Sequence, residues 1–288
     1  MKIKKLYQIL IVMVLCAFSF FYTEKVVDFI RNSDPIMKSI KEKSSHHEIK
    51  PVDAKIEKNK MVPGISGKKV NYKESYKKMK QYGKYNESLT VFESVEPTIS
   101  IQDYYDKYIQ EGSGINNDIS LIFVVRQGDD ITSILNVLNE NAALSTFFVD
   151  GLWLENNESL ATTLAEEGHE LEVLNYNNSY EELYFSSSLN LVNRITNKKP
   201  KYCYAEYDNK EVLELCTKLE LHTIIPTIKT GNYPFSEIKK RLSKGAIASL
   251  PINSSTEIEL PTIINYIRQR GYIINTLDNL LNEAIDVK

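Results

Sequence analysis

The chain has 288 residues, of which 42% are hydrophobic and 25% are charged, and its formal net charge is −3. These values are typical of a globular protein, and they exclude a disordered low-complexity chain and a strongly basic nucleic-acid-binding domain. The charge is unevenly spread, because residues 38–84 hold 14 lysines against 5 acidic residues, while the chain after Ser88 is acidic. We expect the basic section to be either a solvated, flexible stalk or a contact for anionic lipid or an anionic wall polymer.

Residues 1–23 are expected to export the rest of the chain. Lys2, Lys4 and Lys5 precede an apolar run over 6–22, which is close to the shortest length that crosses a bilayer. Positive charge on the leading side places the N-terminus inside and the remainder outside. Ala17-Phe18-Ser19 would suit signal-peptide cleavage, but the apolar run continues past it, which favours an uncleaved membrane anchor. The expected location is therefore single-pass and extracytoplasmic, or secreted if the segment is cleaved.

Two further parts are predicted before residue 115. Residues 24–60 are predicted to be a basic stalk, with a helix interrupted at Pro35 and a linker after Ser44. The linker contains His46 and His47, but adjacent histidines point in different directions and no third ligand is evident, so no metal site is expected there. Residues 61–114 are predicted to form a small appendage with a helix over 72–82, a strand over 89–92 and a helix over 103–110.

From residue 115 to residue 288 the patterns of strand and helix alternate. The run 119–125 is apolar apart from Ser120, which is typical of a strand buried on both faces. Further strands are predicted over 143–150, 170–174, 202–204, 222–225, 246–250 and 272–275, with helices over 129–140, 157–168, 189–197, 209–219, 235–243, 257–270 and 277–284. About seven β/α repeats predict a parallel sheet closed as a barrel. No strand is followed by the Gly-x-Gly-x-x-Gly pattern of a dinucleotide fold.

The three cysteines are Cys16, in the apolar N-terminal run, Cys203, in a predicted strand, and Cys216, in the following helix. A disulfide between the last two would need Cα atoms within about 7 Å of each other. Buried free thiols are the expected state, because unpaired cysteine usually packs as a small hydrophobic residue.

Two motifs in the β/α region carry a family resemblance. Residues 145–151, Ser-Thr-Phe-Phe-Val-Asp-Gly, are similar to Ala-Thr-Phe-Phe-Val-x-Gly, and residues 166–171, Glu-Glu-Gly-His-Glu-Leu, are similar to Glu-Glu-Gly-His-Glu-Ile. Both patterns, and the spacing between them, are similar to those of the polysaccharide deacetylase family, the NodB-homology or carbohydrate esterase domain. The resemblance covers residues 118–281 and implies a NodB-like (β/α) barrel of about seven parallel strands, related to the TIM barrel.

The resemblance also implies a chemistry. Members of the family hydrolyse N- or O-acetyl groups on glycans, using a divalent metal held by one Asp and two His, an adjacent Asp as base and a late His as acid. At the matching positions this chain has Val124 and Val125 for the aspartates, Leu174 and Asn178 for the ligand histidines, and Pro251 for the late histidine. Aliphatic side chains offer no N, O or S donor, so neither a metal cofactor nor metal-dependent hydrolysis is expected.

The leading interpretation is a membrane-anchored, extracytoplasmic and catalytically inactive deacetylase that binds a cell-wall glycan or another glycan. Its candidate glycan-binding residues follow predicted strand ends, where such barrels place their sites. They are Trp153, Tyr176, Tyr204, Glu206 and Tyr207. The same tyrosines would equally well fill a barrel mouth that has lost its metal.

Two alternatives stay open. A divergent but active hydrolase could recruit Asp129, Asp130 and Glu206, with Asp150 and Glu172 further away, although the adjacent aspartates also suit the capping of a helix. A scaffold or interaction protein of the cell envelope would instead use the basic stalk and the 61–114 segment as its working surface.

Overall fold

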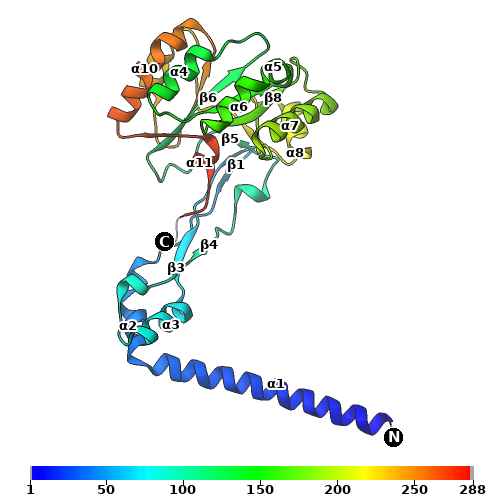
Figure 1. The fold of residues 1–288 in the computed structure, drawn as a ribbon, viewed down its shortest axis with the longest axis vertical. Helices are drawn as coiled ribbons and strands as arrows, with labels where there is room; N and C mark the ends of the chain where they lie inside the picture. The colour runs from blue at the N-terminus through cyan, green and yellow to red at the C-terminus, as the bar shows by residue number, and fades with distance from the viewer. Residues whose placement is uncertain (1, 286–288) are drawn as a thin grey trace. The chain divides into compact units, whose positions relative to one another are not determined.

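The computed structural model describes residues 2–285, except for the side chains of 2–9, 16–17 and 20–24. The chain divides into two compact units (Figure 1). The small unit contains the described residues up to Pro51, residues 66–95 and Ile285, and the large unit contains residues 52–65 and 96–284. The predicted appendage over 61–114 is therefore not one unit, because only its middle part belongs to the small unit.

The small unit consists of helices and one hairpin. Its elements are α1 (Lys2–Ser33), α2 (Pro35–Lys43), η1 (Ser45–His47), β3 (Gly67–Val70), α3 (Tyr72–Tyr82), η2 (Glu87–Leu89) and β4 (Phe92–Val95), and β3 pairs antiparallel with β4. The predicted interruption at Pro35 is confirmed, since Asp34 Oδ1 accepts a hydrogen bond from Ile36 N–H at 2.8 Å and Pro35 begins the next helix. The predicted helix over 72–82 is also confirmed.

In the part of the chain that the structure describes, we find no helix with both the length and the apolarity needed to span a bilayer. Much of the predicted anchor over 1–23, including the Cys16 side chain, falls outside the described side chains.

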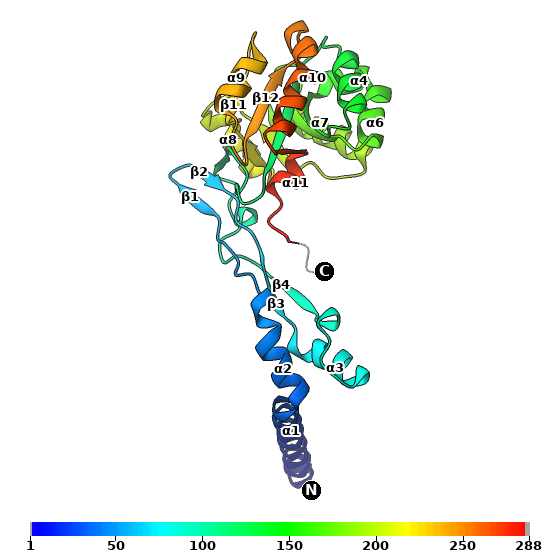
Figure 2. The same cartoon turned by 90° about the vertical axis from the view of Figure 1, so that its left-hand side faces the viewer.

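The large unit is built on one open sheet (Figure 2). The strand order is β1-β2-β5-β10-β9-β8-β7-β6-β12-β11, with β13 beside the start of β6, and every pairing except β1–β2 is parallel. The strands are β1 (Lys55–Glu57), β2 (Lys60–Val62), β5 (Tyr108–Ile109), β6 (Asp118–Val125), β7 (Thr146–Asp150), β8 (Glu170–Asn175), β9 (Tyr202–Tyr204), β10 (His222–Ile224), β11 (Ile228–Lys229), β12 (Ile247–Pro251) and β13 (Ile273–Asn275).

The predicted closed barrel is wrong, and the sheet is a half-barrel. Among the described strands the two edges, β1 and β11, do not pair with each other. One edge ends in an antiparallel hairpin of three-residue strands and the other in a strand of two residues, so neither edge offers a parallel ladder long enough for closure.

The helices of the large unit follow the predicted alternation. They are α4 (Thr132–Glu140), α5 (Gly151–Asn156), α6 (Glu158–Glu166), α7 (Glu182–Thr196), α8 (Lys210–Lys218), α9 (Pro234–Arg241), α10 (Ser254–Gln269) and α11 (Leu277–Leu281). The helix predicted over 103–110 is wrong, because this segment contains the end of the short turn η3 (Ile101–Asp103) and then strand β5. Tyr108 and Ile109 pair with both β10 and β2, and such long-range pairing overrides local helical propensity.

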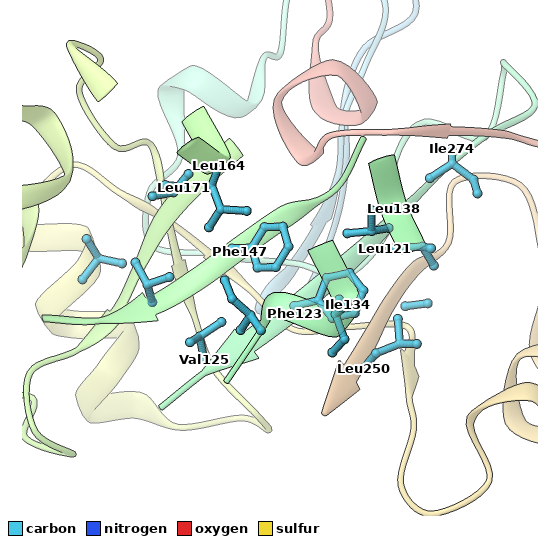
Figure 3. Packing of buried hydrophobic residues seen from close by; sticks show 14 of the residues in the cluster. Leu121, Phe123, Val125, Ile134, Leu138, Phe147, Leu164, Leu171, Leu250 and Ile274 are labelled. Atoms are coloured by element: carbon cyan, nitrogen blue, oxygen red, sulfur yellow. The ribbon is translucent and has the colours of Figure 1, made fainter. Parts of the chain in front are cut away.

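Two apolar layers cover the two faces of the sheet, as the alternation along β6 illustrates. Leu121, Phe123 and Val125 belong to the layer shared with the helices, whereas Ile122 and Val124 belong to the layer on the inner face. Figure 3 shows the helix-side layer, where the rings of Phe123 and Phe147 stack with centroids 5.1 Å apart. A strand buried on both faces explains why 119–125 is apolar at every position except Ser120.

The expectation of free cysteines is wrong for one pair. Cys203 on β9 and Cys216 on α8 form a disulfide, with a Cα–Cα distance of 6.5 Å. Both residues lie in the helix-side layer, so the packing of α8 on the sheet brings their side chains together.

Candidate functional site

The carboxyl ends of β6, β7, β8 and β9 meet at one edge of the sheet, because these strands are parallel neighbours. We call the loops that follow them the mouth: residues 126–131, the start of α5 at 150–151, residues 176–181 and residues 205–209. Most of the sequence-predicted site residues belong to these loops or to the strand ends beneath them.

Two of the positions at which the family resemblance implies an aspartate or a ligand histidine, Val124 and Leu174, lie beneath the mouth in the inner apolar layer. Val124 is 5% exposed and Leu174 is 2% exposed, and both belong to the inner layer together with Phe148 and Tyr204. The Phe148 and Tyr204 rings pack with centroids 5.5 Å apart. Val125 points the other way, into the helix-side layer.

The positions of the second ligand histidine and of the late histidine, Asn178 and Pro251, also provide few donor atoms for a metal. Asn178 lies in the β8–α7 loop with a φ of 61°, and its backbone N–H donates to Asp150 Oδ2 at 3.3 Å. Pro251 ends β12 beside Val124 and has no side-chain donor atom. No three His, Cys, Asp or Glu side chains of the described chain are grouped so that they could hold a metal ion. One amide among aliphatic side chains does not fit the divalent metal that the family resemblance implies.

Asp150 is a buried carboxylate at the end of β7, and its side chain accepts hydrogen bonds from backbone N–H groups. Its Oδ1 accepts hydrogen bonds from the N–H groups of Leu152 at 2.9 Å and Trp153 at 3.3 Å, which caps the N-terminus of α5. Its Oδ2 accepts the bond from Asn178 described above. These bonds tie the β8–α7 loop to the end of β7, so Asp150 shapes the mouth.

Two of the five predicted glycan-binding residues are buried, which corrects that part of the prediction. Trp153 is 1% exposed and donates its indole N–H to the Asp129 carbonyl at 2.9 Å. Tyr204 lies under the mouth with its hydroxyl 3.4 Å from Ser249 Oγ, and burial raises the pKa of its phenol. Both rings therefore fill the interior and present no face for a sugar.

The other three residues reach the surface of the mouth. Tyr176 is half-buried, stacks on Tyr184 with centroids 5.6 Å apart and donates its hydroxyl to Glu155 at 3.1 Å. Glu206 forms an ion pair with Lys229. Tyr207 is 65% exposed, as expected for a ring that is available to a ligand.

Sequence reasoning missed Tyr180 and Arg126, which face the same region. Tyr180 stacks on Phe185 and lies close enough to Arg126, Glu206 and Tyr207 for their charges to affect its ionisation, although burial is the main cause of its raised pKa. The signal was present in the sequence, since both residues follow the ends of predicted strands. Neither matches a family motif, so the resemblance did not select them.

The carboxylates proposed for a relocated active site do not converge. Asp129 Oδ2 accepts from Arg126 N–H at 2.7 Å, and Asp130 Oδ1 accepts from Thr132 N–H at 2.9 Å where α4 begins. The bonds to Thr132 lower the pKa of Asp130. Glu172 lies near the amino end of β8, where it accepts from Tyr202 N–H at 2.9 Å. The adjacent aspartates therefore stabilise the turn and the first turn of α4, and Glu172 is remote from the mouth.

Comparison with known proteins identifies relatives of this scaffold. Residues 117–244 match the family model described as polysaccharide deacetylase. The uncharacterized protein YlxY of Bacillus subtilis (strain 168) is 26% identical over 272 residues, which cover 88% of this chain and 85% of that protein.

Solved structures share the fold. The wild-type protein BA3943 of Bacillus anthracis, described as a CE4 family pseudoenzyme, is 23% identical with a TM-score of 0.68, over 88% of this chain and 97% of that chain. A mutant of BA3943 is described as having restored enzymatic activity. PdaA of Bacillus subtilis, described as a family 4 carbohydrate esterase, is 20% identical with a TM-score of 0.52, over 60% of this chain and 83% of that chain.

Proposed function

We propose that this chain is a divergent polysaccharide deacetylase-like protein that binds a glycan of the cell envelope without hydrolysing acetyl groups. One observation carries the proposal: Val124 and Leu174 lie in the inner apolar layer, where the family resemblance implies a carboxylate and an imidazole. Metal-dependent deacetylation needs a polarised carbonyl and an activated water. Hydrocarbon side chains supply neither.

The surface that remains at the mouth suits a sugar. Tyr207 is exposed, the stacked Tyr176–Tyr184 pair lies on the β8–α7 side, and Glu206 and Lys229 provide hydrogen-bonding groups beside them. Sugar rings commonly pack their C–H face on aromatic side chains and direct their hydroxyls to charged or amide groups. Tyr176, Glu206 and Tyr207 are therefore the glycan-binding residues that we retain.

Two measurements on the purified full chain test the proposal. Acetate release from acetylated chito-oligosaccharides and from peptidoglycan should stay at the background level, with or without added Zn²⁺. Co-sedimentation with insoluble peptidoglycan should be reduced in Tyr207→Ala and unchanged in Tyr82→Ala, a control in which another exposed tyrosine, in the small unit, is removed. Chelator-sensitive acetate release would instead favour the divergent hydrolase. Equal binding by both variants would show that the mouth is not the glycan-binding surface.

The proposal places the protein outside the cytoplasm, held by residues 1–23. The Cys203–Cys216 disulfide supports this location, because structural disulfides persist in oxidising compartments. Protease added to intact cells should degrade the large unit if it is outside, and the chain should remain in the membrane fraction if the N-terminal segment is uncleaved. Protection from protease would count against export, and a soluble secreted chain would indicate cleavage.

A second candidate function, as an envelope scaffold, is favoured by the charge difference between the units. Residues 1–51, 66–95 and 285–288 hold 17 Lys and Arg against 9 Asp and Glu, whereas residues 52–65 and 96–284 hold 18 against 29. The small unit is therefore the part suited to an anionic polymer or an anionic lipid surface. Reversing the charge of Lys73 and Lys78 on α3 should weaken binding to such polyanions at low salt, and unchanged binding would remove this candidate.

A further inference from the structure

A second concave region of the large unit lies at the amino ends of β8, β9 and β10, away from the mouth. It contains two adjoining cavities of 570 Å³ and 380 Å³, and residues 199–201 and Asp278 line both. We call it the amino-end groove. The ion pair between Lys201 Nζ and Asp278 Oδ1, at 2.6 Å, marks the boundary between the two cavities. The residues that replace the family's metal ligands do not line either cavity.

The smaller cavity has an aromatic wall. Tyr105 stacks on His222 with centroids 4.6 Å apart and an interplanar angle of 20°, and Tyr202 lies 6.2 Å from His222. His222 and Tyr202 are buried, whereas Tyr105 is partly exposed, so Tyr105 is the ring that solvent reaches. A partly exposed ring backed by two buried rings offers a fixed surface for the C–H face of a sugar.

Polar groups surround this wall. Gln102, Glu220 and Asn282 are exposed at the rim of the smaller cavity. Asp278 uses Oδ1 to accept from both Lys201 Nζ and Tyr202 Oη, which fixes the carboxylate in place. In the described part of the chain, the buried Nδ1 of His222 has no hydrogen-bond partner. An aromatic face with a few fixed polar groups is typical of small-molecule sites.

Charges of both signs line this groove: Lys198, Lys199 and Lys201 lie close together in the chain, whereas Glu220 is exposed at the rim of the smaller cavity. Glu283 lies buried in the wall of the smaller cavity, and Glu170 and Glu172 line the larger one. Lys198 and Lys199 are exposed and have no ion-pair partner within 4.0 Å among the described residues, whereas Lys201 is neutralised by Asp278. Burial, and then the charge of Lys201, lowers the pKa of His222 to about 4, so the imidazole is neutral at physiological pH. The two unpaired ammonium groups would therefore attract an anionic substituent on a ligand.

We infer that the amino-end groove binds a carboxylated sugar, with the ring on Tyr105 and the carboxylate at Lys199. The ligand class rests on the proposed function, but the site is separate from the mouth and shares no residue with it. The chain would thereby contact an acidic glycan at two ends of the same half-barrel.

N-acetylmuramic acid and N-acetylglucosamine test this inference, because the first carries a lactyl carboxylate that the second lacks. The full chain is titrated with each sugar while NMR follows the His222 ring, assigned by its loss in His222→Gln, and the indole N–H of Trp153. The chain has one tryptophan, and its indole N–H donates to the carbonyl of Asp129 in the mouth. Shifts at His222 therefore report on the groove, and shifts at Trp153 report on the mouth.

We expect N-acetylmuramic acid to shift the His222 signals and to bind there at least tenfold more tightly than N-acetylglucosamine. Lys199→Glu should lower that affinity at least tenfold, while Lys240→Glu, an exposed lysine on α9, should leave it unchanged. The Lys199 side chain is exposed, so this variant is expected to fold normally.

The titration can reject binding at the groove and binding at the mouth independently of each other. If Trp153 shifts and His222 does not, the groove inference is overturned and the proposed function stands. If His222 shifts and Trp153 does not, the groove inference stands and the mouth loses its support. Equal affinity for the two sugars, or an unchanged affinity in Lys199→Glu, would also overturn the carboxylate assignment.

Discussion

Replacing Val124 by aspartate tests whether the inner layer beneath the mouth is closed to a carboxylate. Val124 is buried in the same inner apolar layer as Phe148, Leu174 and Tyr204, so the new carboxyl would enter a mainly aliphatic and aromatic environment. Loss of the two valine methyl groups costs about 1.5 kcal/mol of burial energy. A neutral carboxyl without full hydrogen bonding adds about 1–3 kcal/mol. The free energy of unfolding should therefore fall by about 2.5–4.5 kcal/mol even at low pH.

The loss should increase with pH. Burial raises the pKa of the new carboxyl above the unfolded value of about 3.9. As the pH rises, the unfolded state therefore loses this proton at a lower pH than the folded state does. Between that pH and the folded pKa, the variant should lose a further ~1.4 kcal/mol per pH unit relative to wild type. Since domains have about 5–15 kcal/mol in total, Val124→Asp should be mostly unfolded near neutral pH at the lower end of that range.

Urea unfolding at pH 4, 5.5 and 7 measures this effect, with Val124→Asn as the matched control. Asparagine has nearly the same shape and cannot ionise, so the two variants should be similar at pH 4 and diverge as the pH rises. Equal stability of Val124→Asp and wild type at pH 7 would refute the apolar inner layer, and the argument against metal binding would lose its main support.

Four further outcomes are expected. Glu172→Gln should reduce the loss of wild-type stability above pH 4.5, because burial raises the folded-state pKa of Glu172 well above that value; an unchanged pH slope in urea unfolding would contradict this. The His222 ring should titrate near pH 4 in NMR, and its lowered pKa should make stability fall between pH 6.5 and 4; a midpoint near 6.5 would show that the ring is solvated. Cys216→Ser should lower the free energy of unfolding by about 2–4 kcal/mol and abolish the mobility difference between reduced and non-reduced gels. Equal stability of the wild type with and without reductant would contradict this. A chelator should leave the melting temperature unchanged, and a fall would reveal a structural ion.

The sequence predicted the order of elements in the large unit because local signals and tertiary packing agree there. Strand β6 is apolar at every position after Asp118 except Ser120, and α10 is capped by Asn253, whose side chain accepts from Thr256 N–H at 2.9 Å. Both features are local in sequence. Strand β5 was out of reach because two residues carry no periodicity and are stabilised only by strands far away in the chain. The prediction of barrel closure failed for a related reason, because closure depends on pairing between edge strands that are far apart in the chain.

The candidate site divides in the same way. Chain position correctly placed Trp153 and Tyr204 close to the carboxyl end of the sheet, but the direction of each side chain depends on packing that one sequence does not reveal. The disulfide was missed because spacing alone does not tell how closely α8 approaches β9. The missing metal donors required no such knowledge, since valine and leucine lack donor atoms in any conformation.

The replacements at the family positions have a consequence for stability as well as for chemistry. A ligand site keeps polar groups partly desolvated, whereas Val124 and Leu174 are fully packed and each contribute about 1.5–3 kcal/mol of burial. Active sites are commonly strained or under-packed, so packed hydrocarbon at these positions permits a more stable scaffold than a metal site would. Selection for stability alone would not require the exposed Tyr207 at the mouth or the unpaired Lys199 at the amino-end groove. These exposed groups are therefore the positions at which a retained binding function should be sought.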